Sequence, residues 1–356
     1  MNTILKLDRI SHTYGEQVIV NELSFDLKKG EIGCLLGPSG CGKTTVLRCI
    51  AGFEPIASGE IWLNENSVSC AGFLLPPEQR RIGMVFQEYA LFPHLTVTAN
   101  VGFGLHRSTK AERAHRVDEL LRITDLTEVA NRYPHELSGG QQQRVALVRA
   151  LAPHPDLILL DEPFSNLDVS LREYLGQEIR ELLKKLNITA ILVTHDQAEA
   201  FAVADKIGVM HAGKMMQWGS AHALYHHPVN RFIADFIGQG TLIPGKVTHS
   251  DTVETELGTL TGNIFHPDHS SHEITNNRVD ILIRPDNIIH DHDSPLQAVV
   301  IHKAFRGAQF LYTLRLDSGQ NVLSLISSHH DYTIGEKIGI RPQIDYIVVF
   351  DRLNSQ

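Results

Sequence analysis

The sequence predicts a two-domain protein, an α/β domain with a largely parallel sheet followed by a small all-β barrel. The length of 356 residues corresponds to about two domains of roughly 150 residues each. Over residues 31–236, apolar runs of strand length alternate with helical patterns, which is typical of an α/β fold. The remaining residues have a β pattern almost throughout. We therefore place the boundary near Gly238 and expect domains at 1–237 and 238–356.

Four apolar runs are expected to form the parallel sheet. Each is rich in Ile, Leu and Val, as expected for strands buried on both faces. They are Ile32–Leu36, Ile82–Phe86, Leu157–Leu160 and Thr189–Val193. Before them, looser alternation around residues 4–10 and 18–27 predicts the antiparallel strands of a flanking β subdomain.

A one-faced helix is expected between the last two of these strands. Its apolar residues are spaced four, four, three and four apart, which places them on one side of a helix. They are Leu171, Leu175, Ile179, Leu182 and Leu186.

Short β runs separated by Gly, Asp, Ser and Asn predict an OB-like barrel after Gly238. The runs are Val279–Ile283, Leu296–Ile301, Phe310–Leu316, Val322–Leu325 and Tyr346–Phe350.

Composition excludes several classes of protein. With 41 acidic and 32 basic residues the net charge is −9, so strong attraction to nucleic acid or to an anionic membrane is not expected. No apolar run approaches the ~18 residues of a bilayer span, and the first ten residues lack a secretory apolar region. We expect an intracellular protein that reaches a membrane only through a protein partner.

The four cysteines are Cys34, Cys41, Cys49 and Cys70, and they show no C-x-x-C spacing. This argues against a disulfide framework and a zinc site, so free thiols are expected. Cys41 lies in a glycine-rich loop at a helix start, where its thiol is either activated by the helix dipole or fills space. We favour the second interpretation.

Residues 37–44, Gly-Pro-Ser-Gly-Cys-Gly-Lys-Thr, fit the phosphate-loop pattern G-x-x-x-x-G-K-[ST] between an apolar strand and a helix. The glycines let backbone N–H groups approach a β-phosphate. Lys43 adds a charge at the β/γ-phosphates, and the Thr44 hydroxyl is a Mg²⁺ ligand. The expected nucleotide contacts are Gly37, Pro38, Ser39, Gly40, Cys41, Gly42, Lys43, Thr44 and Thr45.

A second buried strand ends in two adjacent carboxylates, which a purely structural strand rarely has. Asp161 is expected to hold the Mg²⁺ hydration shell, and Glu162 to polarise the attacking water as a general base. His195 follows the strand 191–194, so it should lie at the carboxyl edge of the sheet, where ligands bind. A surface histidine at a strand end is the alternative, and we favour a functional role.

The segment Leu137-Ser-Gly-Gly-Gln141 precedes a helical run that extends to Leu151. Ser138 as N-cap and Gln141 three residues later form a capping box. Gly139 and Gly140 leave the backbone N–H groups and the positive helix end unobstructed, which predicts a second anion site. Both interpretations can hold together.

In this order, these motifs resemble those of ABC-transporter nucleotide-binding subunits over nearly the whole chain. The motifs are residues 37–44, 137–141, 157–162, 165–168 and 194–196. The resemblance implies an ABC ATPase core of the P-loop type, with an antiparallel β subdomain and a helical subdomain. It also implies that the ligands are ATP and Mg²⁺.

The resemblance further implies a head-to-tail homodimer. In it, Ser138, Gly139, Gly140 and Gln141 of one subunit close over the γ-phosphate held by the other. Gln87 matches the glutamine that contacts Mg²⁺ and relays closure to the membrane subunits, and Asp168 matches the aspartate that signals across the interface. Tyr14 matches the aromatic residue that stacks on adenine, with a structural strand-end tyrosine as the alternative.

A chain with one nucleotide domain and no spans resembles an importer subunit. This implies two permease subunits, an extracytoplasmic solute-binding protein and a peripheral position on the cytoplasmic face of the inner membrane. Residues 88–97 resemble the surface that receives the permease coupling helices, with ordinary packing as the alternative.

The C-terminal part resembles the regulatory barrel of importers for sugars, polyamines, sulfate and ferric iron. Residues 75–83, 89–93 and 161–164 are most similar to ferric-iron importers. We therefore expect ferric iron as the cargo, with sulfate, polyamine or sugar as the alternative.

Two other classes of function are less consistent with the sequence. A soluble ABC ATPase acting on nucleic acid or ribosomes predicts a coiled-coil insertion or a second ATPase copy, and we find neither; the net charge also argues against a nucleic-acid partner. A non-catalytic regulatory subunit predicts a degenerate Lys43, Glu162 or signature segment, and all are intact.

The chain has 20 histidines, some of them in suggestive clusters. His266, His269 and His272 are spaced three apart, while His290 and His292 alternate with aspartates. A metal sensor is one hypothesis. We favour solvated loops, because a proline after His266 breaks any helix that would align the ligands.

Overall fold

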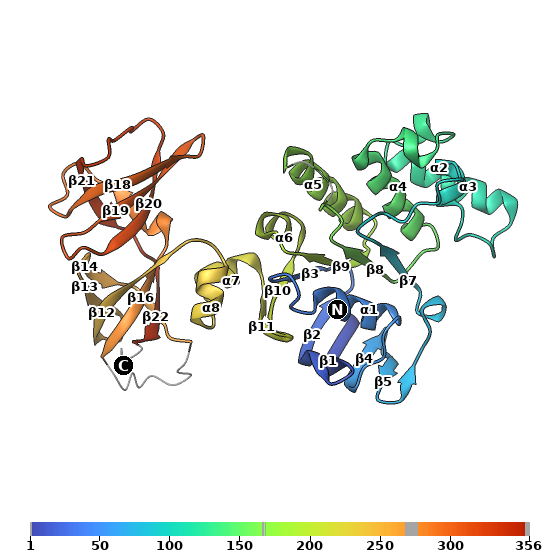
Figure 1. Cartoon of the computed structure of the whole chain (residues 1–356), viewed down its shortest axis with the longest axis horizontal. Helices are drawn as coiled ribbons and strands as arrows, with labels where there is room; N and C mark the ends of the chain where they lie inside the picture. Colours follow the sequence, from blue (N-terminus) through green and yellow to red (C-terminus); the bar gives the residue numbers. More distant parts are fainter. Residues whose placement is uncertain (1, 166, 168, 268–276, 353–356) are drawn as a thin grey trace. The chain divides into compact units, whose positions relative to one another are not determined.

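The computed structural model describes residues 2–165, 167, 169–267 and 277–352. The chain divides into two compact units, Met1–Ala221 and His222–Gln356, and Figure 1 shows the elements of each. Residues 222–237 thus group with the second unit, and the domain boundary that we place near Gly238 stays a prediction.

The first unit contains an antiparallel sheet of order β2-β1-β4-β5-β6, and both strands expected from the alternating pattern belong to it. Its strands are β1 (Thr3–Tyr14), β2 (Gln17–Lys28), β4 (Ser58–Leu63), β5 (Asn66–Cys70) and β6 (Phe73–Leu74).

The central sheet has the order β11-β10-β3-β9-β8-β7, and β10, β3, β9, β8 and β7 run parallel. Its strands are β3 (Ile32–Leu36), β7 (Ile82–Val85), β8 (Leu157–Asp161), β9 (Thr189–Thr194), β10 (Lys206–His211) and β11 (Lys214–Gly219). This confirms the four predicted strands, although β7 ends one residue before Phe86. Because these strands are parallel, the segments that follow β3, β8 and β9 meet at one edge.

Six α-helices accompany these sheets in the described part of the first unit (Figure 1). They are α1 (Lys43–Ala51), α2 (Val97–Val101), α3 (Lys110–Ile123), α4 (Gly139–Leu151), α5 (Val169–Lys185) and α6 (Gln197–Val203). In α5, Leu175 and Ile179 are buried as expected. The next core residue is Leu183, which the predicted stripe omitted, while Leu182 is only half-buried.

The second unit begins with two short helices, α7 (Ala221–His226) and α8 (Arg231–Phe236). Two sheets follow, of order β14-β13-β12-β16-β22-β15 and β17-β21-β18-β19-β20, and they enclose one apolar core that includes Tyr312 and Ile281. All their pairings are antiparallel except β15 with β22, which confirms the expected OB-like barrel.

The strand bounds of the first of these sheets are β12 (Thr241–His249), β13 (Thr252–Thr255), β14 (Gly258–Thr261), β15 (Asn263–Phe265), β16 (Arg278–Ile283) and β22 (Tyr346–Asp351). Those of the second are β17 (Ile288–His290), β18 (Gln297–Phe305), β19 (Gln309–Arg315), β20 (Asn321–Ser327) and β21 (Lys337–Pro342).

The described histidines do not form a metal centre. No group of three or more His, Cys, Asp or Glu side chains in the described residues could hold a metal ion. His290 instead shares a 2.8 Å hydrogen bond with the hydroxyl of Tyr332. His269 and His272 lie outside the described residues.

Candidate active site

The phosphate loop connects the fully buried strand β3 to helix α1. Gly40 and Gly42 adopt φ angles of 79° and 101°, in the left-handed region that L side chains avoid. A Cβ atom on Gly42 would lie 2.9 Å from the carbonyl oxygen of Ile19. The glycines therefore allow both the sharp turn and the close packing of the loop against the neighbouring chain.

Lys43 follows the loop glycines as the first residue of α1 and is 5% exposed. Its ammonium group donates hydrogen bonds to the carbonyl oxygens of Gly37 at 2.8 Å and Pro38 at 3.0 Å. A buried ammonium normally has an anionic partner, and here the ammonium donates to carbonyl oxygens of the loop. The position therefore fits a phosphate group of a nucleotide.

Thr44 and Asp161 bring the phosphate loop and the end of β8 together. The Thr44 hydroxyl donates to a carboxylate oxygen of Asp161 at 3.0 Å. Burial raises the pKa of Asp161, the hydrogen bond from Thr44 opposes this, and the neighbouring Glu162 raises it further. A hydroxyl and a carboxylate are hard oxygen donors of the kind that Mg²⁺ prefers, so the pair fits that ion.

Glu162 and His195 follow the adjacent strands β8 and β9. The carboxylate Oε1 of Glu162 lies 3.4 Å from Nδ1 of His195. Glu162 has a φ of 44°, which is unusual for a residue other than glycine, and its N–H donates to the carbonyl of Val193 at 3.0 Å. The structure thus brings together the expected base and the expected edge histidine.

Ser138 caps helix α4 as the sequence predicts. Its hydroxyl accepts a hydrogen bond from the N–H of Gln141, whose side chain accepts one from the N–H of Ser138. A Cβ on Gly139 would lie 3.2 Å from Leu167, so larger residues there must displace a neighbour. No hydrogen bond or ion pair joins these signature residues to the phosphate loop within the described chain.

The other expected site residues are more scattered. Tyr14 ends β1, is 45% exposed and donates its hydroxyl to Glu54 at 3.0 Å. Gln87 lies exposed in a turn after β7. Asp168 lies outside the described residues, so its expected role stays a prediction.

Cys41 is buried within the phosphate loop. Burial raises the pKa of its thiol, although the nearby Lys43 acts in the opposite direction. A raised pKa keeps the thiol protonated and unreactive, which supports the interpretation that this side chain fills space.

Arg172 in α5 connects two loops that flank the site. The sequence analysis did not predict this role. Its guanidinium donates to the carbonyl of Leu167 at 3.0 Å and to the carboxylate of Asp196 at 3.2 Å, and it lies 3.3 Å from Glu199. Asp196 is also the N-cap of α6. The spacing of Asp196 and Glu199 is a sequence signal that could have indicated this cap, whereas no local pattern indicates the arginine.

An apolar groove of about 960 Å³ lies beside the segment that follows β7. Phe53, Phe86 and Phe103 line it and are exposed, and Phe92 from the expected docking segment lines it as well. Exposed apolar side chains gathered in one groove are a common feature of protein-contact sites.

Two family models match the chain. The model described as ABC transporter matches residues 20–165, and the model described as TOBE domain matches residues 281–350. The first spans the phosphate loop, the signature segment and the two adjacent carboxylates.

Similar proteins cover the chain from end to end. An Fe(3+) ions import ATP-binding protein of Fusobacterium nucleatum is 40% identical over 100% of this chain and 95% of its own length. One from Haemophilus influenzae is 42% identical over 80% of this chain and 79% of its own. A putrescine transport ATP-binding protein of Escherichia coli is 38% identical over 98% and 95%.

A solved structure is also similar. The cbiO1 component of the ABC transporter complex cbiONQ from Clostridium perfringens has a TM-score of 0.57 and 28% identity, and covers 62% of this chain and 89% of that one.

No helix in the described part of our chain has the length and apolar character to span a membrane.

The fold and the matched motifs define an ABC-type ATPase domain of the P-loop class. The chain belongs to the ATP-binding subunits of ABC importers that carry a C-terminal TOBE barrel.

Proposed function

We propose that this importer subunit hydrolyses ATP at Glu162 to drive the uptake of ferric iron. The catalytic role is supported by two contacts at one edge of the sheet: Thr44 with Asp161, and Glu162 with His195. The cargo rests on the two ferric-ion import relatives at 42% and 40% identity.

Each site residue has a separate role in ATP hydrolysis. Lys43 exchanges its loop carbonyls for the oxygens of the β/γ-phosphates, and the backbone N–H groups of the loop hold the β-phosphate. Glu162 accepts a proton from the attacking water, and His195 contacts the γ-phosphate. Thr44, Asp161 and Gln87 would hold Mg²⁺, which would supply charge neutralisation for the phosphates.

The working form is a head-to-tail homodimer. The capped start of α4 offers bare N–H groups at Gly139 and Gly140. Among the residues that the structure describes, no hydrogen bond or ion pair joins it to its own chain's phosphate loop. It therefore serves the γ-phosphate of the partner subunit, and hydrolysis weakens that contact and opens the dimer. Asp168 signals across this interface, and Tyr14 stacks on adenine.

The apolar groove receives the permease. Phe86, which lines the groove, immediately precedes Gln87 in the chain, so a movement of the permease reaches the nucleotide site through this residue. The protein is then a peripheral subunit on the cytoplasmic face of the inner membrane, together with two permease subunits and an extracytoplasmic solute-binding protein.

Polyamine import is the second candidate. It is favoured by relatives that are named as spermidine/putrescine or putrescine transport proteins, at 36–40% identity. The segment 75–83, which supported ferric iron, has a structural role, because Arg80 within it is buried and bonds the backbone of its own domain. The cargo must therefore be tested directly.

The test is uptake of labelled ferric iron by iron-starved cells that carry either the native subunit or Glu162→Gln. We expect ferric uptake to fall at least about tenfold, because the base is lost, while uptake of putrescine, sulfate and sugar stays unchanged. Glu173→Gln, at an exposed position of α5, is the matched control and should transport normally. A selective loss of putrescine uptake would instead support the polyamine alternative.

A further inference from the structure

His12 is a buried residue of β1 that the proposed mechanism does not use, and it shortly precedes Tyr14. Only 3% of its surface is exposed. Its Nδ1 atom lies 2.7 Å from the carbonyl oxygen of Pro55. A carbonyl oxygen can only accept, so Nδ1 carries a proton and donates this hydrogen bond. The bond connects β1 to the segment that follows α1.

The second ring nitrogen of His12 makes no such bond. Nε2 is buried and has no hydrogen-bond partner among the residues that the structure describes. A buried polar atom without a partner lowers the stability of a fold. An apolar side chain would fill the same space without this loss. Packing alone therefore does not account for a histidine at this position.

The ring of His12 packs against the ring of Tyr14. The ring centres are 4.6 Å apart and the angle between the planes is 83°, an edge-to-face arrangement that aromatic rings favour. The Tyr14 hydroxyl is held separately, by its 3.0 Å hydrogen bond to Glu54. Tyr14 is thus fixed at its ring and at its hydroxyl, although it is 45% exposed and ends a strand.

The partners of this His–Tyr pair follow the helix that begins at the phosphate loop. Gly52 ends α1 with a left-handed φ of 87°, and Glu54 and Pro55 come directly afterwards. The nine residues of α1 span about 14 Å. One end of this helix therefore adjoins the phosphate loop, and the segment at its other end positions the Tyr14 ring.

We propose that His12 is a positioning residue for the purine base of ATP. Its ring holds Tyr14 in the orientation in which adenine stacks on it, at a distance from the phosphate loop that α1 sets. The proposal rests on the stacking role that we propose for Tyr14. Because His12 is buried, it acts through Tyr14, and it contributes to the binding of the base rather than to the chemical step.

Steady-state ATP hydrolysis of two variants tests this role. His12→Asn keeps an N–H donor for Pro55 and removes the ring, whereas His12→Phe keeps an aromatic ring and removes the donor. We expect the KM for ATP to rise at least about fivefold in His12→Asn and less than about twofold in His12→Phe, because stacking contributes about tenfold or more to the binding of a base. The kcat should stay within about twofold of native in both.

A native KM in His12→Asn would overturn the proposal. An equal rise in His12→Phe would overturn it as well, because the bond to Pro55 rather than the ring would then be the source of the effect. If His12→Asn does not fold, the KM of His12→Phe decides in the same way.

A double-variant cycle with Tyr14→Ala separates positioning from a general loss of structure. If His12 acts through Tyr14, adding His12→Asn to Tyr14→Ala should change the KM less than about twofold further. Effects that multiply in the double variant would overturn the proposal for His12 and leave the stacking role intact. A native KM in Tyr14→Ala would instead reject the stacking role itself, and the role of His12 with it.

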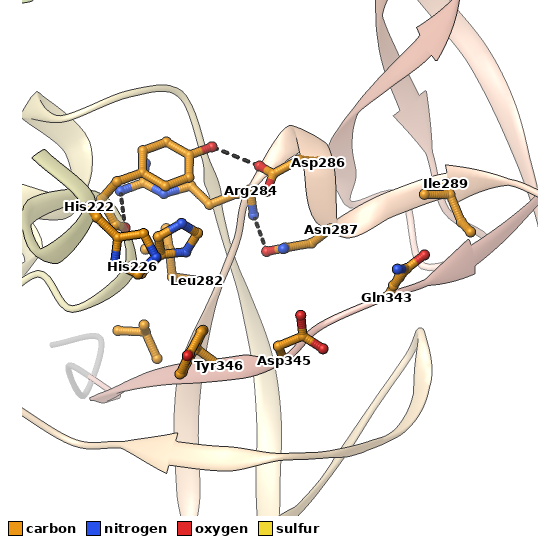
Figure 2. A pocket seen from close by; sticks show the side chains of 12 residues that line it. His222, His226, Leu282, Arg284, Asp286, Asn287, Ile289, Gln343, Asp345 and Tyr346 are labelled. Atoms are coloured by element: carbon orange, nitrogen blue, oxygen red, sulfur yellow. Dashed lines mark hydrogen bonds between the residues drawn. The ribbon is translucent and has the colours of Figure 1, made fainter. Parts of the chain in front are cut away.

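His226→Asn is the matched control. This residue of α7 belongs to the second unit and is labelled in Figure 2. Its ring also packs edge-to-face on a tyrosine, with a distance of 5.0 Å to the centre of the Tyr225 ring. The KM for ATP should stay within about twofold of native in this variant. A rise as large as in His12→Asn would overturn the proposal, because the effect would then not depend on Tyr14.

Discussion

The hydroxyl of Thr44 donates a 3.0 Å hydrogen bond to Asp161, although the two residues are 117 positions apart in the sequence. Parallel pairing of β3 with β9 and of β9 with β8 brings the ends of these strands to one edge. The Thr44 hydroxyl and the Asp161 carboxylate thus meet at the start of α1, directly after the phosphate loop.

Asp161→Asn should therefore remove most ATP hydrolysis. We expect a loss of at least about 100-fold in turnover, because the variant loses a charge at the site where Mg²⁺ neutralises phosphate. Steady-state phosphate release measures this. Asp118→Asn, at an exposed position in α3, is the control and should keep the native rate; equal rates for the two variants would refute the metal role.

Arg80→Lys should destabilise the first unit. The Arg80 guanidinium donates to the carbonyls of Leu75, Cys49, Ile50 and Val68 and to the Ser69 hydroxyl, at distances of 2.7–3.0 Å. Lysine has three donors and cannot replace these contacts, so the free energy of unfolding should fall by about 2–4 kcal/mol.

Urea titration followed by circular dichroism measures this difference. The neighbouring Arg81 is exposed, so Arg81→Lys is a matched control and should stay within about 0.5 kcal/mol of the native value. An unchanged midpoint for Arg80→Lys would show that these bonds add no net stability.

Arg149→Lys should loosen the segment after Gln87. Arg149 in α4 donates to the carbonyls of Ala90 at 2.6 Å and Tyr89 at 2.8 Å, and both acceptor residues have a left-handed backbone. Loss of one such bond should raise amide exchange in residues 89–95 about tenfold, because it removes about 1.4 kcal/mol from the cost of opening. Native exchange rates in this variant would contradict the account; Arg122→Lys, exposed in α3, is the control.

Phe103→Glu should weaken permease binding without slowing the isolated ATPase. Phe103 is 53% exposed and packs on Phe92 with ring centres 4.3 Å apart. A charge in this groove should lower copurification of membrane subunits at least about tenfold, since docking buries apolar area there. Phe73→Glu places the same charge on an equally exposed residue of β6, outside the groove, and should copurify normally.

Sequence alone predicted the strands of the parallel sheet, the phosphate loop and the cap at Ser138, because each has a local pattern with a known geometry. It could not predict Arg80, Arg149 or Arg172, since their partners are backbone carbonyls or carboxylates in other elements. It also missed Leu183, because adjacent leucines at 182 and 183 fit the helical period almost equally well. The contact between Glu162 and His195 follows from strand order, which no motif states.

The central claim is that Glu162 acts as the general base, and one measurement tests it most directly: ATP binding and ATP turnover of Glu162→Gln compared with the native chain. The account predicts ATP affinity within a few-fold of native, stable ATP-bound dimers and turnover reduced at least about 100-fold. Native turnover in this variant would contradict the account, because the carboxylate beside His195 would then have no part in activating water.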